Sequence, residues 1–123
     1  MQRFVAIEVA PNTSELLGVI ETIALQKGVI SYINVTFPGG CVGLVYLQIF
    51  CHGEQISPWN KVSALRGNDI TIVALKDYEL LQPPYEVLVK VWNLDDTYTH
   101  TPLVDIMELE NVEKSLPELL LGL

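Results

Sequence analysis

The sequence predicts an all-β fold, an antiparallel β-sandwich of jelly-roll-like form, on three observations. Gly and Pro interrupt the chain at short intervals and leave segments of strand length rather than helix length. Several of these segments alternate apolar and polar side chains, as a half-buried strand does. About seven or eight such segments, spaced roughly 8–12 residues apart, are typical of a sandwich or barrel.

The clear strands are predicted where β-branched and aromatic residues follow one another between turn residues. They cover residues 3–9, 29–37, 43–50, 70–75, 86–92 and 103–109. Residues 43–50 show little alternation, which predicts a central strand buried on both faces. The core-facing sets predicted by alternation are Val5, Ile7 and Val9; Val29, Ile33, Val35 and Phe37; and Val87, Val89 and Val91. A His-Gly pair at 52–53 indicates a hairpin turn.

Residues 15–25 fit two interpretations. Leu16, Leu17, Ile20 and Ile23 follow helical spacing, and residues 12–14 (Asn-Thr-Ser) suit a helix cap. As a strand, the segment places Leu17, Val19, Ile23 and Leu25 on one face, with Glu21 out of place. We predict an extended segment, because it lies between two strands with short Gly-containing links.

The length of 123 residues suits one domain with a proper core. We assign residues 1–110 to the sandwich and residues 111–123 to a Leu-rich C-terminal arm. Ser115 and Glu118 resemble a capping box, with Pro117 in the first turn, but the turn is too short to be stable alone. The apolar side chains that must therefore contact another surface are Leu116, Leu119, Leu120, Leu121 and Leu123. That surface is either the chain's own sandwich or a neighbouring subunit, and on the second interpretation truncation after Glu110 weakens assembly.

The composition limits the partners. Seven Lys and Arg residues stand against fifteen Asp and Glu, a net charge of −8, and the basic residues are scattered. Direct nucleic-acid binding is not expected, because it needs a basic patch. Half of the residues are apolar and mean hydropathy is +0.33, which favours an apolar surface covered by another protein chain in a homo-oligomer. No apolar run reaches the roughly 18 residues of a membrane helix, so no membrane association is expected. The N-terminal residues do not resemble a secretory signal.

No catalytic or metal constellation is visible, and we predict a protein that is not an enzyme and needs no cofactor or metal. His52 and His100 are the only histidines, and no Gly-x-Ser-x-Gly motif is present. Cys41 and Cys51 are too few for a disulfide framework, and we expect buried free thiols.

A carbohydrate- or host-surface-binding module is the alternative function. Its site would combine aromatic side chains that stack on sugars with carboxylates that bind hydroxyl groups. The residues of this alternative site are Trp59, Trp92, Asp95, Asp96 and Tyr98. Both tryptophans also suit the edge of a core, where large aromatic side chains commonly pack.

The runs GVISYINVTFPGGCVGLVYLQIF, GEQISPWN, LRGND and PPYEVLVKVWNLDDTYTHT resemble small β-sandwich proteins of viruses and tailed phages. The resemblance covers about residues 28–101, departs from the pattern at Gly39 and Asn68, and leaves out the C-terminal arm. It implies a virion structural component, such as a capsid decoration (cement) protein or a neck or tail accessory, that binds copies of itself and a larger assembly. It brings no catalytic residues. The expected location is the virion, or the cytoplasm if the protein is not viral.

Overall fold

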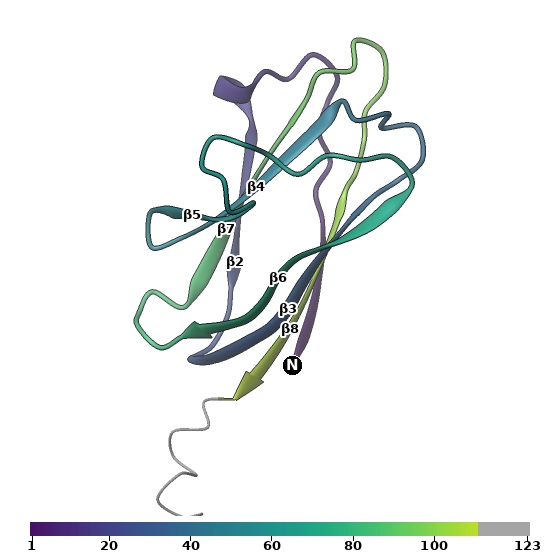
Figure 1. The fold of residues 1–123 in the computed structure, drawn as a ribbon. Helices are drawn as coiled ribbons and strands as arrows, with labels where there is room; N and C mark the ends of the chain where they lie inside the picture. Colours follow the sequence, from purple (N-terminus) through teal and green to yellow (C-terminus); the bar gives the residue numbers. More distant parts are fainter. Residues whose placement is uncertain (111–123) are drawn as a thin grey trace, which may run out of the picture.

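The computed structural model describes residues 1–110, which form two four-stranded antiparallel sheets packed face to face (Figure 1). The predicted β-sandwich is therefore confirmed. The predicted arm, with Leu116, Leu119, Leu120, Leu121 and Leu123, lies outside the described residues.

The elements follow one another without an α-helix in the described part of the chain. Their bounds are β1 Gln2–Ala6, η1 Glu15–Leu17 (one 3₁₀ turn), β2 Val19–Ala24, β3 Gly28–Phe37, β4 Val45–Cys51, β5 Glu54–Ser57, β6 Ile70–Leu80, β7 Glu86–Asn93 and β8 Leu103–Glu110. The sequence did not predict β5, and it predicted only the first half of β6.

The strand order is that of a jelly roll. One sheet has the order β1-β8-β3-β6 and the other β2-β7-β4-β5, so most connections cross between the sheets. The connections β1–β2, β3–β4, β5–β6 and β7–β8 gather at one end of the sandwich, and the shorter ones lie at the other end (Figure 1). The backbone amino group of Met1 donates to the Glu108 carbonyl at this second end.

The core lies between the sheets and is built by alternation. Val87, Val89 and Val91 of β7 are fully buried, as predicted, and Leu47 and Ile49 of β4 lie beside them on the same inner face. Inner faces of this kind interdigitate and are apolar because burial removes their side chains from water.

One predicted core residue is wrong because β3 carries an irregularity. Ile33, Val35 and Phe37 are fully buried, but Ile30 takes the place predicted for Val29. The register against β8 shifts between Ile30 and Tyr32, so one additional residue reverses the inward and outward positions on the two sides. Simple alternation cannot reveal such a bulge.

Residues 15–25 are mainly extended, as predicted, since β2 covers Val19–Ala24. The prediction that Leu17 shares the inward face is wrong, because it lies in the 3₁₀ turn η1 and is 77% exposed. Gly18 ends this turn against β7, where an added Cβ would lie 3.1 Å from the Val91 carbonyl oxygen. The close approach explains why a glycine separates the turn from β2.

The predicted His-Gly turn is confirmed as the hairpin between β4 and β5. His52 and Gly53 both have positive φ, at 51° and 78°, which is the conformation of a type I′ turn. The His52 imidazole Nε2 lies 3.0 Å from the Gln82 carbonyl and 3.2 Å from that of Pro84. The turn thus fixes the neighbouring β6–β7 connection.

Candidate functional site

The outer face of the β2-β7-β4-β5 sheet is hollowed by three adjoining pockets of about 360, 260 and 480 Å³. The first two share Phe50, Gly53 and Lys90, and the first and third share Glu15 and Val62. We call this continuous depression the outer groove. Its lining residues include Glu15, Ile20, Tyr46, Gln48, Phe50, Glu54, Lys61, Val62, Arg66, Leu88, Lys90 and Trp92.

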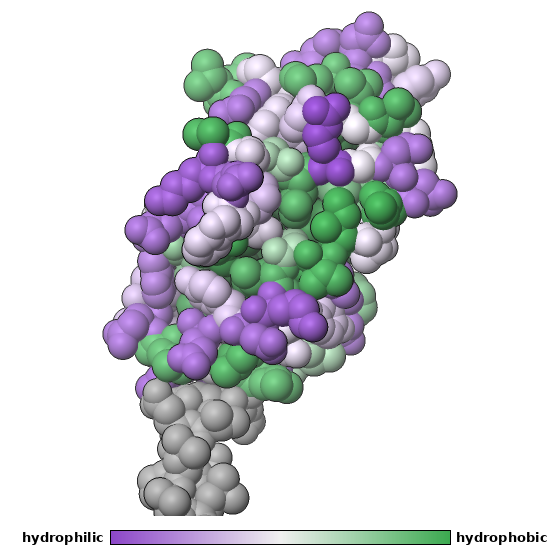
Figure 2. Space-filling model, in the orientation of Figure 1, coloured by the Kyte–Doolittle hydropathy of each residue, from purple (hydrophilic) through white to green (hydrophobic). Residues whose placement is uncertain are grey.

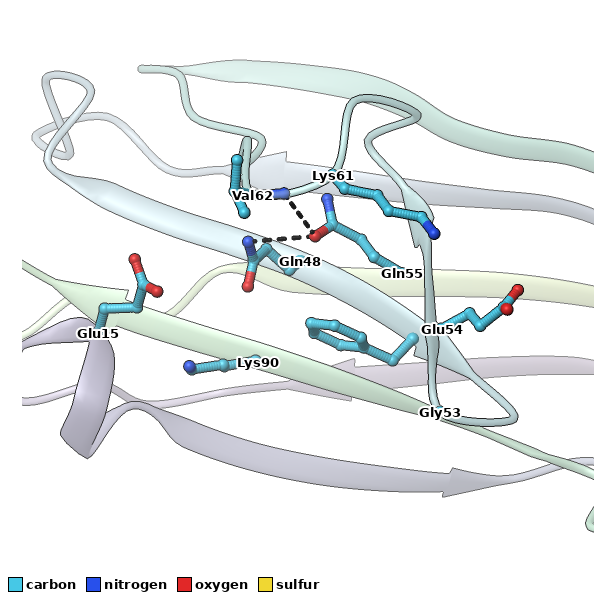
Figure 3. Close-up of a pocket in the computed structure, with 9 residues that line it drawn as sticks. Glu15, Gln48, Gly53, Glu54, Gln55, Lys61, Val62 and Lys90 are labelled. Carbon is cyan, nitrogen blue, oxygen red and sulfur yellow. Dashed lines mark hydrogen bonds between the residues drawn. The ribbon is translucent and has the colours of Figure 1, made fainter.

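Two glutamines fix one wall of the outer groove (Figure 3). The Gln48 side-chain amide donates to the Ser63 carbonyl at 3.0 Å and reaches the Gln55 side-chain oxygen at 3.4 Å. The same Gln55 oxygen accepts a hydrogen bond from the Val62 backbone N–H at 3.3 Å. The side-chain amide group of Gln55 donates to three carbonyls of the β5–β6 connection, those of Pro58, Asn60 and Ser63. The amide groups of both glutamines and the Gln55 oxygen are therefore occupied within the protein, and they shape this wall of the groove.

A column of stacked side chains forms the end of the groove nearest the long connections. The rings of Tyr46 and Trp92 stack at 5.3 Å, with an angle of 4° between them. The Arg66 guanidinium lies 4.7 Å from the Tyr46 ring centre, and the Lys90 ammonium lies 5.6 Å from that of Trp92. Trp92 is only 5% exposed, so its faces are occupied by the protein itself.

The five residues of the alternative sugar-binding site lie on different parts of the surface. Trp92 belongs to the outer groove, whereas the side chain of Trp59 is 89% exposed and lines a fourth hollow with Leu75 and Tyr78. This hollow shares Glu54, Gln55 and Lys61 with the first pocket of the groove. The β7–β8 connection carries the other three, with Tyr98 and Asp96 exposed and Asp95 buried. The carbohydrate-binding alternative stays a prediction, with its two tryptophans in different pockets.

Both carboxylate oxygens of Asp95 are hydrogen-bonded to other groups of the protein. Its Oδ2 lies 2.8 Å from His100 Nε2, and its Oδ1 accepts from the backbone N–H groups of Thr97 and Tyr98. The hydrogen bond from His100, then that from Thr97, holds the pKa of the Asp95 carboxyl below its ordinary value. Asn93 completes the network, since its side-chain oxygen accepts from the Asp95 N–H and its amide group donates to the carbonyls of Val9 and Tyr98.

Both cysteines are buried free thiols, as predicted. Burial, with a smaller effect of the Asp95 carboxylate, raises the pKa of the Cys41 thiol. Burial is also the main cause that raises the pKa of Cys51. A raised pKa keeps both groups as thiols at neutral pH, which is the unreactive form.

The outer face of the other sheet is the second candidate surface. Phe4 of β1, Val73 of β6 and Leu109 of β8 point away from the core and are 62%, 58% and 51% exposed. The register places Phe4 opposite Asp105, Asp105 opposite Asn34, and Asn34 opposite Val73, so one row crosses all four strands. The side chains that flank this row are Leu103, Met107, Val29 and Tyr32. We call these residues the apolar face.

Residues 1–110 contain neither a candidate metal-binding cluster nor a candidate membrane-spanning helix. No group of three or more His, Cys, Asp or Glu side chains is placed there to hold a metal ion. No helix within these residues has the length and apolar character needed to cross a membrane.

No protein-family model matches the chain, and no curated protein or solved structure matches it either. The two candidate surfaces are therefore assigned from the structure of this chain alone.

Sequence reasoning did not predict either surface. The groove depends on side chains from β2, β4, β5 and β7 and from the connections that flank them, which only the jelly-roll order brings together. The apolar face had a weak signal, because Phe4, Leu103 and Leu109 occupy the outward positions of strands whose inward positions are also apolar.

Proposed function

We propose that this protein is a non-enzymatic structural subunit that associates with copies of itself and binds a larger protein assembly. The observation that supports this most is the apolar face of the β1-β8-β3-β6 sheet. In a two-sheet sandwich the outward positions are ordinarily polar, because water covers them. Here several outward positions carry large apolar side chains (Phe4, Val73 and Leu109) beside polar ones such as Asp105 and Asn34, and no other described element of the chain covers them (Figure 1).

The charge distribution favours a protein partner on this face. Its charged side chains are few, namely Asp105, Lys76 and Glu79, and Asp105 is held by a hydrogen bond from Gln2 at 3.0 Å. Figure 2 shows that hydrophobic side chains also reach the surface on the side presented there, around the region that β6 crosses in Figure 1. Exposed apolar side chains gathered on one face of a sheet support an association site between proteins.

The assembly that we propose is a virion, in which the protein decorates the capsid or belongs to the neck or tail. This part of the proposal rests on the resemblance of residues 28–101 to small β-sandwich proteins of viruses and tailed phages. The jelly-roll order supports it as a fold that viral capsid proteins commonly use, although lectin domains and cupins use it as well.

Sedimentation velocity over a range of protein concentrations tests the self-association. We expect the wild type to form oligomers as the concentration rises, and the variant Phe4→Glu to remain monomeric over at least a tenfold wider range. The matched control is Thr22→Glu, which adds the same charge at an exposed strand position of the other sheet. A wild type that stays monomeric at every concentration, or a control as impaired as Phe4→Glu, contradicts the proposal.

A further inference from the structure

We infer that the outer groove is the docking site for residues 111–123 of the same chain. The groove has an apolar floor in Ile20, Phe50 and Leu88, and Val62 stands exposed at its rim. Residues 111–123 contain the largest cluster of leucines in the sequence and need an apolar surface to cover them. This inference does not depend on the self-association proposed above.

The end of β8 brings this segment within reach of the groove. Glu110 pairs with Gly28 at the start of β3, and Gly28 is eight residues from Ile20 of β2 along the chain. Eight residues span at most about 28 Å, whereas the thirteen residues 111–123 reach at most about 45 Å. Since β2 is the edge strand of its sheet, the segment has only to pass around that edge to lie over Ile20 and Leu88.

The charges of the two parts are compatible. The groove holds Lys61, Arg66 and Lys90 beside Glu15 and Glu54, a net charge of +1 in a chain whose net charge is −8. The segment carries Glu113, Glu118 and Lys114, a net side-chain charge of −1, beside its leucines. Carboxylates at the rim of an apolar contact lose little hydration and gain from nearby ammonium and guanidinium groups.

Two features of the groove favour an apolar polypeptide over a sugar. The amide groups of Gln48 and Gln55 and the Gln55 oxygen are already occupied by one another and by the β5–β6 connection. Val62 is 91% exposed at the rim with φ at 68°, a conformation that is unfavourable for a β-branched residue. The Gln55 side chain holds Val62 in this conformation through a hydrogen bond to its backbone N–H. Strained residues of this kind are common at binding sites, and an apolar segment that covers Val62 would remove its side chain from water.

Docking within one chain is favoured over docking between copies by the effective concentration. A segment joined to its site by a short connection meets that site at a concentration of the order of millimolar, without any association step. A segment from a second copy occupies the groove to the same extent only when the protein concentration itself is of that order.

Two-dimensional NMR spectra of the full chain test the inference. The segment variant carries Leu119→Asp, Leu120→Asp and Leu121→Asp, and its control carries Asn111→Asp, which also adds a carboxylate to the segment but removes no leucine. We expect the segment variant to shift amide resonances of Ile20, Phe50, Leu88 and Val62, at every protein concentration. Those of the β1-β8-β3-β6 sheet should stay in place, and the control should cause at most a small part of the change. In a Val62→Asp background the effect of the segment variant should fall severalfold.

Two results overturn the inference. One is a set of shifts confined to residues next to Glu110, which would place the segment away from the groove. The other is a set of groove shifts that appear only as the protein concentration rises, which would assign the occupant to a second copy. Neither result bears on self-association through the apolar face, which sedimentation of Phe4→Glu tests separately.

Discussion

At the scale of single residues, the buried Asn93 connects three segments of the chain. Its amide group donates to the carbonyls of Val9 and Tyr98, at 3.1 and 2.9 Å, and its oxygen accepts from the Asp95 N–H at 3.0 Å. A buried carbonyl or N–H that loses its partner without gaining water destabilises the fold. The side chain therefore holds the β7–β8 connection against the segment that follows β1.

We predict that Asn93→Ala lowers the free energy of unfolding by about 1–3 kcal/mol. Asn34→Ala is the matched control, because the Asn34 side-chain oxygen has no hydrogen-bond partner in the structure. Urea unfolding followed by circular dichroism measures both variants. Equal losses in the two would show that the network around Asn93 contributes nothing specific.

The pair of Asp95 and His100 predicts a dependence of stability on pH. Because its hydrogen bonds lower the pKa of Asp95 in the folded state, the ionised carboxylate stabilises the fold above its ordinary pKa of about 3.9. This contribution is lost as the pH falls through the lower, folded-state pKa. The melting temperature of the wild type should therefore exceed that of Asp95→Asn at pH 6, and the difference should shrink below about pH 4.

Asp96→Asn is the control for this comparison, since Asp96 is exposed and its carboxylate accepts a hydrogen bond from the Thr97 hydroxyl at the surface. It removes the same charge from the same connection. A difference between wild type and Asp95→Asn that is constant from pH 3 to pH 7 would contradict the assigned role of the carboxylate.

At the scale of elements, the bulge in β3 decides which side chains enter the core. The sequence predicted Val29, and the structure places Ile30 there at 0% exposure. We predict that Ile30→Ala destabilises the protein by about 2–5 kcal/mol, while Val29→Ala costs less than about 1 kcal/mol. Chemical denaturation of the two variants measures the difference, and the reverse order would show that β3 alternates without interruption.

The strands themselves were largely predictable because their signals are local. Val87, Val89 and Val91 alternate with larger or polar side chains, and His52-Gly53 marks a two-residue hairpin. The exceptions have physical causes. A bulge adds one residue without a mark in the sequence, and η1 separates Leu16 and Leu17 from β2 because Gly18 packs against the Val91 carbonyl.

At the scale of the whole molecule, the sequence predicted the sandwich but not the surfaces on it. Register and strand order place Phe4 of β1 and Val73 of β6 in one row, although the two residues are far apart in the sequence. The outer groove likewise joins Glu15, Gln48 and Lys90 from three separate segments. Pairings over such sequence distances follow from the packed fold and cannot be read from local patterns.

This architecture carries two surfaces, one that we propose for association between copies and one that we infer binds the chain's own C-terminal segment. They belong to opposite sheets, so each can be occupied without blocking the other. The structural role that we propose depends most on the first of them.

Hydroxyl-radical footprinting at low and high protein concentration tests that role most directly. Phe4 and Met107 belong to the apolar face and react readily when exposed, whereas Trp59 is exposed on a connection outside it. The proposal predicts that oxidation of Phe4 and Met107 falls severalfold as the concentration rises, while that of Trp59 stays unchanged. Oxidation of Phe4 and Met107 that is equal at both concentrations would contradict it.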